Sequence, residues 1–171
     1  KQAGIAGAFK GALQYAGNPE LIARPHFARY LVEQGICSSV GEAFALYLKE
    51  GKPGYVPQRW AALPQAVSWI TQSGGIAIMA HPARYDFSPQ EEACLFDAFT
   101  QAGGQGVEVI TASHSAAESQ HYADLALQYG LYASCGSDFH SPGESRIDIG
   151  SIPPLPAKLT PVWTALHSRI R

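Results

Sequence analysis

The chain has 171 residues, of which 46% are hydrophobic and 15% charged, and Lys+Arg 12 against Asp+Glu 14 give a net charge of −2. This composition indicates a folded globular domain, and the lack of a basic field excludes a binder of long duplex nucleic acid, so any phosphate recognition is local. No apolar stretch reaches the ~20 residues that a membrane-spanning helix needs. The cysteines are predicted to be reduced, buried thiols of a cytoplasmic protein: Cys37, Cys94 and Cys135.

Residues 1–56 are predicted to form a small helical subdomain. Apolar side chains at i, i+3 and i+4 spacing predict a helix over 27–34, which a glycine closes. A capping-box pattern at Ser39 and Glu42 predicts a second helix over 43–50. The subdomain therefore lacks any strand signal.

Residues 57–171 alternate between strand and helix patterns. Strands with little polar alternation, separated by helices, predict a parallel sheet buried on both faces. Right-handed crossovers bring the carboxyl ends of such strands to one edge, where ligands bind in α/β folds. The predicted strands cover 76–80, 107–110 and 131–134, and the predicted helices cover 64–70, 88–100, 116–129 and 161–170. The three tryptophans are predicted to be packing residues.

Two of these strands are followed by residue types that bind metals in proteins. His81 follows the first strand and precedes a proline, and Asp138 and His140 follow the third strand after a glycine. Carboxylate oxygen and neutral imidazole nitrogen are ligands that borderline divalent metals accept. The alternatives are that Asp138 caps a turn beside an exposed His140, and that His81 is a satisfied core histidine. The pairing of the two strand ends favours a metal site.

Three further residues lie at or near the same strand ends. Arg84 follows His81 by three positions, and its guanidinium suits a substrate phosphate, although it is otherwise a solvated surface arginine. Glu108 interrupts an apolar strand, and a buried carboxylate needs a partner. It is predicted to lie in or near the site, or else to pair with an arginine. His114 lies past the same strand and is a candidate for substrate contact.

The chain resembles the PHP (polymerase and histidinol phosphatase) superfamily of metal-dependent phosphoesterases, in its bacterial branch that acts on nucleotides and RNA 5′ ends. The motifs that carry the resemblance are Ala80-His-Pro-Ala-Arg-Tyr85, Gly106-Val-Glu-Val109 and Gly136-Ser-Asp-Phe-His140. Residues 24–30 and 51–57 look like the helical insertion of that branch. Together these motifs cover nearly the whole chain from about residue 20 onward.

The resemblance implies the later strands of a distorted seven-stranded βα-barrel with a helical insertion. It makes His81, Asp138 and His140 metal ligands, and it places Arg24, His26 and Lys52 of the insertion at the substrate, near a second phosphate or the nucleotide. Manganese is the metal that the resemblance favours, while the ligand chemistry alone also allows zinc or iron.

One family motif is missing. PHP enzymes begin with an H-x-H motif on the first strand, and none of the six histidines here forms one. The only methionine is Met79, so Lys1 is not expected to be a native start. We therefore expect the chain to be the C-terminal part of such an enzyme, whose partner is the N-terminal PHP segment of the parent chain.

The implied function of the intact enzyme is hydrolysis of nucleotide phosphate esters by metal-activated water. The resemblance gives two forms of it: a 3′,5′-nucleoside bisphosphate phosphatase, or a 5′→3′ exoribonuclease that acts on the 5′ end of a short RNA. Two alternatives remain: a catalytically incompetent fragment with an incomplete metal site, and a metal hydrolase of the amidohydrolase type. Arg84 and Lys52 argue against the last, because carboxamide substrates need no cationic clamp.

Overall fold

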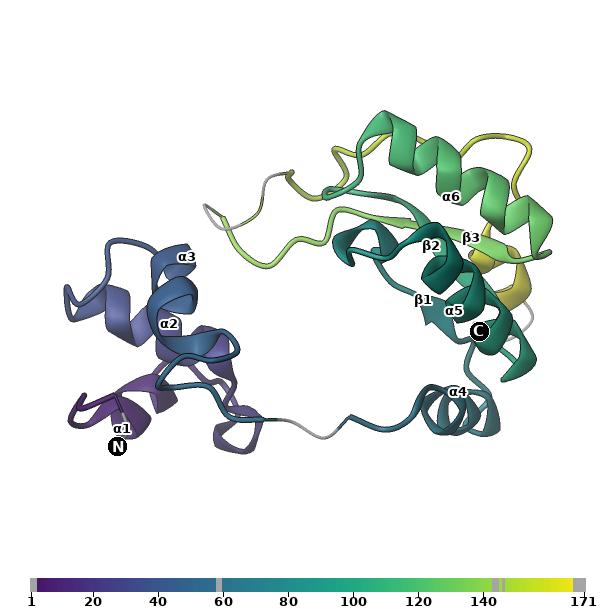
Figure 1. The fold of residues 1–171 in the computed structure, drawn as a ribbon. Helices are drawn as coiled ribbons and strands as arrows, with labels where there is room; N and C mark the ends of the chain where they lie inside the picture. The colour runs from purple at the N-terminus through teal and green to yellow at the C-terminus, as the bar shows by residue number, and fades with distance from the viewer. Residues whose placement is uncertain (1–2, 58–59, 143–144, 146, 168–171) are drawn as a thin grey trace. The chain divides into compact units, whose positions relative to one another are not determined.

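A computed structural model describes residues 3–57, 60–142, 145 and 147–167, and the chain forms two compact units, Lys1–Trp60 and Ala61–Arg171. Figure 1 shows a helical first unit and a second unit built around a small sheet. The boundary predicted from the sequence falls after residue 56, and the compact units divide at Trp60. Each unit has a hydrophobic cluster of its own.

The first unit consists of short helices around a small core. Its buried residues are Ala28, Leu31, Cys37, Ala43 and Leu48. Its elements are α1 (Ala8–Leu13), a 3-10 helix (Pro19–Leu21), α2 (Arg24–Glu33), α3 (Val40–Ala43) and a π-helix (Phe44–Leu48).

The capping signal at Ser39 is present, but the helix after it is not a continuous α-helix. The Ser39 hydroxyl accepts a hydrogen bond from the backbone N–H of Glu42 at 3.1 Å, which starts α3. The carboxylate of Glu42 bonds the backbone N–H and hydroxyl of Ser38 instead of completing a box with Ser39. Of the range 43–50, only Ala43 is therefore α-helical, as the last residue of α3, and the chain continues as the wider π-helix Phe44–Leu48.

The second unit is an α/β structure with a three-stranded parallel sheet in the order β1-β2-β3. Its elements are α4 (Leu63–Gln72), β1 (Ile78–Met79), a 3-10 helix (Pro82–Arg84), α5 (Pro89–Gln101), β2 (Gly106–Thr111), α6 (Ala116–Gln128), β3 (Tyr132–Gly136) and a 3-10 helix (Val162–Leu166). Each of the longer helices α5 and α6 begins after a serine whose hydroxyl accepts from the N–H of the residue three positions on, in a capping box. The parallel sheet places all three strand ends at one edge, as expected.

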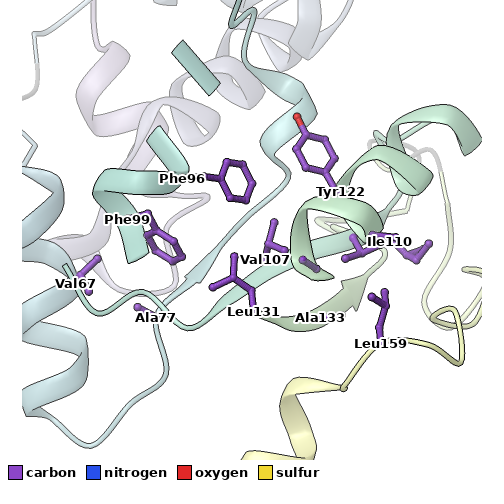
Figure 2. Packing of buried hydrophobic residues seen from close by; sticks show 13 residues of the cluster. Val67, Ala77, Phe96, Phe99, Val107, Ile110, Tyr122, Leu131, Ala133 and Leu159 are labelled. Carbon is purple, nitrogen blue, oxygen red and sulfur yellow. The ribbon is translucent and has the colours of Figure 1, made fainter. Parts of the chain in front are cut away.

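The core of this unit lies between the sheet and its helices (Figure 2). Phe96 of α5 is completely buried, and its ring lies 6.4 Å from that of Tyr122 on α6. Val107 and Val109 of β2 are also completely buried. α6 packs along β2, which fixes the strand that runs through the middle of the sheet. The central strand is therefore the best-anchored part of the second unit.

The two edges of the sheet differ. On the outer side of β3, the backbone N–H of Ala133 donates to the carbonyl of Thr160 at 2.9 Å, and Ala133 bridges Pro161. On the outer side of β1, no strand pairs with Ile78–Met79 within the described ranges. β1 is an edge strand in this chain.

Several expectations were wrong. The helix predicted over 161–170 is the 3-10 turn Val162–Leu166, and its last residues, from 168 on, lie outside the described residues. The tryptophans are not buried packing residues: Trp60, Trp69 and Trp163 are 81%, 56% and 44% exposed. Cys94 is exposed and Cys135 is only partly buried, whereas Cys37 is buried as expected.

In the described part of the chain, every helix is too short or too polar to cross a bilayer.

Candidate active site

His81 leaves β1 in an unusual backbone conformation. Its φ of 34° and ψ of 56° place a non-glycine residue in the left-handed region, which L-residues adopt only where surrounding contacts hold them. Its backbone N–H donates to Oε2 of Glu108 at 2.7 Å. Its side-chain Nδ1 is buried and has no hydrogen-bond partner among the described residues. A buried imidazole nitrogen without a partner fits a group that binds something from outside this part of the chain.

Asp138 and His140 leave β3 in a turn that orients both side chains. Asp138 also has a positive φ, of 50°. The carbonyl of Asp138 lies 2.8 Å from Nδ1 of His140, so this nitrogen is the protonated donor. The opposite nitrogen, Nε2, then keeps its lone pair, which is the arrangement that metal-binding histidines use. His140 is 65% exposed along its side chain, so that lone pair is accessible.

Arg84 connects the end of β1 with the end of β3. Its Nη1 donates to Oδ2 of Asp138 at 2.9 Å across 54 positions of sequence. Their side chains are 50% and 24% exposed. The structure therefore brings together Arg84, predicted to bind phosphate, and Asp138, predicted to bind metal. The Asp138 carboxylate has a cationic partner in Arg84.

The two other candidates near this edge bond the backbone of the turn after β1. Glu108 bonds His81 as described, and no arginine contacts its carboxylate among the bonds of the described residues. His114 lies 3.0 Å by Nδ1 from the carbonyl of Val109, and its Nε2 accepts from the N–H of Ala83 at 3.4 Å. Both ring nitrogens of His114 are thus engaged, and its ring stacks on Tyr122.

Sequence reasoning missed two residues at the end of β2. The hydroxyls of Thr111 and Ser113 are buried without a partner, and with Nδ1 of His81 they make up the unpartnered buried side-chain atoms of the described residues. All three belong to strand ends at the same edge of the sheet. Polar residues directly after an apolar strand are the signal that marks them in the sequence.

The candidates from the insertion belong to the first unit. Arg24 is the first residue of α2 and lines a cavity of about 630 Å³ with Phe27, Tyr47 and Tyr55. His26 accepts the backbone N–H of Ala23 through Nδ1 at 3.0 Å, which caps the start of α2. Lys52 lies in the turn after the π-helix, where its N–H bonds the carbonyl of Lys49.

The donor chemistry at the strand ends fits a divalent metal. The unpartnered Nδ1 of His81, the free lone pair of His140 and the carboxylate of Asp138 are the nitrogen and oxygen ligands that such ions take. Within the described ranges, no three histidine, cysteine or acidic side chains converge closely enough to hold an ion by themselves. The described residues thus supply suitable ligands without forming a complete shell.

Comparisons with known proteins find relatives that match nearly the whole chain. No family model matches the chain. It is 48% identical over 168 residues to a 3′,5′-nucleoside bisphosphate phosphatase of Chromobacterium violaceum, covering 98% of this chain and 59% of the relative. It is 42% identical over 163 residues to the 5′-3′ exoribonuclease Rnm of Escherichia coli, covering 95% of this chain and 55% of that protein.

Two solved structures are also similar to the chain. A Chromobacterium violaceum structure, described as an amidohydrolase with bound sulfate and no metal, superposes with a TM-score of 0.89 at 48% identity, over 99% of this chain and 58% of that one. A candidate metal-dependent phosphoesterase from Bifidobacterium adolescentis has a TM-score of 0.70 over 91% of this chain and 53% of that one. At 23% identity the latter likeness shows the fold alone.

Relatives named as phosphatase and exoribonuclease thus match nearly the whole chain, and a candidate metal-dependent phosphoesterase shares its fold. These findings support the resemblance of the chain's motifs to the PHP superfamily. It spans 55–59% of the length of the curated relatives that match nearly all of it.

Proposed function

We propose that the chain is the C-terminal part of a metal-dependent phosphoesterase that hydrolyses phosphate esters of nucleotides, as a 3′,5′-nucleoside bisphosphate phosphatase or a 5′→3′ exoribonuclease on short RNA. The observation that carries the proposal is the ion pair between Arg84 and Asp138, because it joins an anion-binding group to a metal-binding group at one edge of the sheet. The relatives' names support this reaction class. So does the sulfate in the Chromobacterium violaceum structure, since sulfate has the shape and charge of a phosphate.

In this proposal, His81, Asp138 and His140 hold the metal. Bound divalent metal, with manganese preferred over zinc or iron, supplies a water of lowered pKa and neutralises phosphate charge. Asp138 contributes its carboxylate, and His140 offers Nε2 because its Nδ1–H is held by the carbonyl of Asp138. Arg84 lies at the same edge, where its guanidinium binds the substrate phosphate and opposes the negative charge that develops during attack.

The insertion supplies the remaining substrate contacts in this proposal. Arg24 and Lys52 add positive charge for a second phosphate, and His26 lies two residues after Arg24 on α2. The cavity beside Arg24 is lined by aromatic and aliphatic side chains, which suits a nucleoside. In this proposal all three residues therefore bind substrate.

We also propose that the sheet is the later part of a seven-stranded βα-barrel. The outer side of β1 is unpaired among the described residues, and Ile78 of that strand is 37% exposed. An open strand edge with an exposed apolar side chain is a pairing site for another strand. The N-terminal PHP segment of the parent chain fits that place, and it would bring the missing metal ligands. The free cysteines fit our placement of the enzyme in the cytoplasm.

The test is hydrolysis by a polypeptide that joins the chain to the N-terminal PHP segment, assayed with 3′,5′-bisphosphate nucleotides and short 5′-phosphorylated RNA. We expect activity that a chelator abolishes and manganese restores. D138N is expected to lower kcat/KM at least about 100-fold, since a lost ligand costs at least as much as a lost supporting group. The matched control is D86N, because Asp86 is exposed in the loop after Arg84. Equal activity of D138N and D86N contradicts the proposal.

The fragment and amidohydrolase alternatives predict different results. If the chain alone binds no manganese or zinc at micromolar levels and hydrolyses no nucleotide phosphate, then catalysis needs the N-terminal segment. The amidohydrolase description of the Chromobacterium violaceum structure favours testing carboxamides as well. If substitution of both Arg84 and Lys52 leaves phosphate-ester turnover unchanged, the argument from a cationic clamp fails and the amidohydrolase alternative is open again.

A further inference from the structure

Glu108 is a carboxylate in the middle of an otherwise apolar strand. Its neighbours Val107 and Val109 are completely buried, whereas Glu108 is half-buried and, because side chains alternate along a strand, belongs to the other face of β2. Oε2 of Glu108 accepts the backbone N–H of His81 at 2.7 Å, across 27 positions of sequence. A hydrogen bond from an amide to a charged, partly buried oxygen is stronger than one between neutral groups. Glu108 therefore holds the first residue after β1.

The other oxygen of Glu108 faces β3. Glu108 pairs with Ser134, and after a register shift between residues 108 and 110, Thr111 pairs with Gly136. A side-chain carbon added to Gly136 would lie 3.2 Å from Oε1 of Glu108, so glycine leaves the space that this carboxylate uses. The shift acts as a β-bulge, which re-aims side chains at the end of a strand. The Glu108 carboxylate thus lies between the ends of β1 and β3.

The turn that Glu108 holds, directly after β1, carries the imidazole of His81 and the guanidinium of Arg84. His81 has a left-handed backbone, and the N–H of Arg84 donates to the carbonyl of His81 at 3.0 Å. His114 supports the same turn through the N–H of Ala83. The strain of a left-handed histidine persists only where neighbours over-determine it. The backbone bond to Glu108 is the most direct such contact on His81.

From this geometry we infer that Glu108 is a positioning residue, which fixes the backbone of His81 and so aims both the imidazole and Arg84, instead of contacting the substrate. The inference rests on the proposed function only for its effect on turnover. A carboxylate repels a substrate phosphate, and both of its oxygens already face protein groups. Its place under the turn suits orientation better than binding.

The direct test is amide hydrogen exchange of the chain itself, measured by NMR without metal or substrate. E108V removes the acceptor at similar volume, and E108Q keeps a carbonyl acceptor at the same reach. We expect the His81 amide to exchange at least about 10-fold faster in E108V and within about 3-fold of the parent in E108Q, as for loss and retention of one strong hydrogen bond. The control S134A changes the facing residue of β3, and its His81 amide is expected to match the parent.

Amides in the β2–β3 ladder separate local from global effects. If the Tyr132 amide, which donates from β3 to the carbonyl of Gln105 just before β2 at 2.9 Å, accelerates as much as the His81 amide, the variant has lost overall stability. If the His81 amide is unchanged in E108V, Glu108 does not hold it. Either result overturns the inference. It stands if only the turn is affected.

Turnover of the joined polypeptide gives the second readout. E108V is expected to lower kcat about 100-fold with little change in KM, since a misplacement of about 1 Å has that cost, and E108Q is expected to recover most of the loss. A rise in KM without faster His81 exchange would instead assign Glu108 to substrate binding. If no phosphoesterase activity exists, the exchange data still decide the positioning role, so the two failures are distinguishable.

Discussion

The Arg84–Asp138 ion pair makes a prediction in which one substitution has opposite effects on two ligands. Arg84 occupies one oxygen of a proposed metal ligand at 2.9 Å. A divalent metal must compete with the guanidinium for that carboxylate, whereas a phosphate needs the guanidinium for itself. R84Q removes the positive charge and keeps a polar side chain. Metal affinity is therefore expected to rise and phosphate affinity to fall.

The exposure of the pair sets the size of each effect. The side chains are 50% and 24% exposed, so the pair belongs with exposed ion pairs, which contribute about 0.2–1 kcal/mol. Losing that competitor is expected to tighten metal binding by about 1.4- to 5-fold. A charge-assisted hydrogen bond to phosphate contributes about 1.5–3 kcal/mol, so phosphate binding is expected to weaken by about 10- to 150-fold.

Titration calorimetry of the joined polypeptide with manganese, and separately with inorganic phosphate, measures both changes. K158Q is the matched control, because Lys158 pairs with Asp124 at the same 2.9 Å on elements away from the strand ends. It is expected to alter neither affinity. Weaker manganese binding in R84Q would show that Arg84 supports the metal ligand instead of competing for it. Unchanged phosphate affinity would remove Arg84 from the anion site.

The remaining predictions concern stability and are measured by urea unfolding. F96A is expected to cost about 3–5 kcal/mol, because Phe96 is completely buried. G11A is expected to destabilise by about 1–3 kcal/mol despite alanine's helix preference, since the new carbon overlaps the ring of Tyr30. Hydrogen bonds from the Ser115 side chain and backbone hold the pKa of Glu118 below its ordinary 4.5. The stability that these bonds add to the folded state is therefore fully present above pH 4.5 and is lost as the pH falls through the lower folded pKa. S115A is expected to flatten this dependence of the unfolding free energy on acid pH.

Each of these predictions has a control or a contradicting outcome. The control for F96A is L127A, which truncates a side chain that is 49% exposed and is expected to lower the unfolding free energy by under about 1 kcal/mol. G17A adds a carbon that meets nothing within 4 Å and is expected to be neutral or stabilising by up to about 1 kcal/mol. An S115A variant whose unfolding free energy keeps the parent's slope between about pH 3 and 6 would contradict the assignment to Glu118.

Local signals in the sequence predicted their elements well. The serines before α5 and α6 cap their helices with the glutamate three residues on, because that contact is made within one turn and needs no other part of the chain. The parallel sheet with its strand ends at one edge also followed from apolar strands that alternate along the chain with helices. Where packing intervened, the same reasoning failed: the helix after Ser39 became a π-helix, and Cys94 and the tryptophans turned out to be exposed.

The sequence by itself determined the residue types at the strand ends and, through its motifs, the resemblance to the PHP superfamily. It did so because metal and phosphate chemistry restricts which side chains are useful there. Only the tertiary structure decided which of these side chains meet: Arg84 with Asp138 across 54 positions, and Glu108 with the backbone of His81 across 27. Such partners are set by strand register and by the shift in β2, which depend on how the strands pack and leave no local mark in the chain.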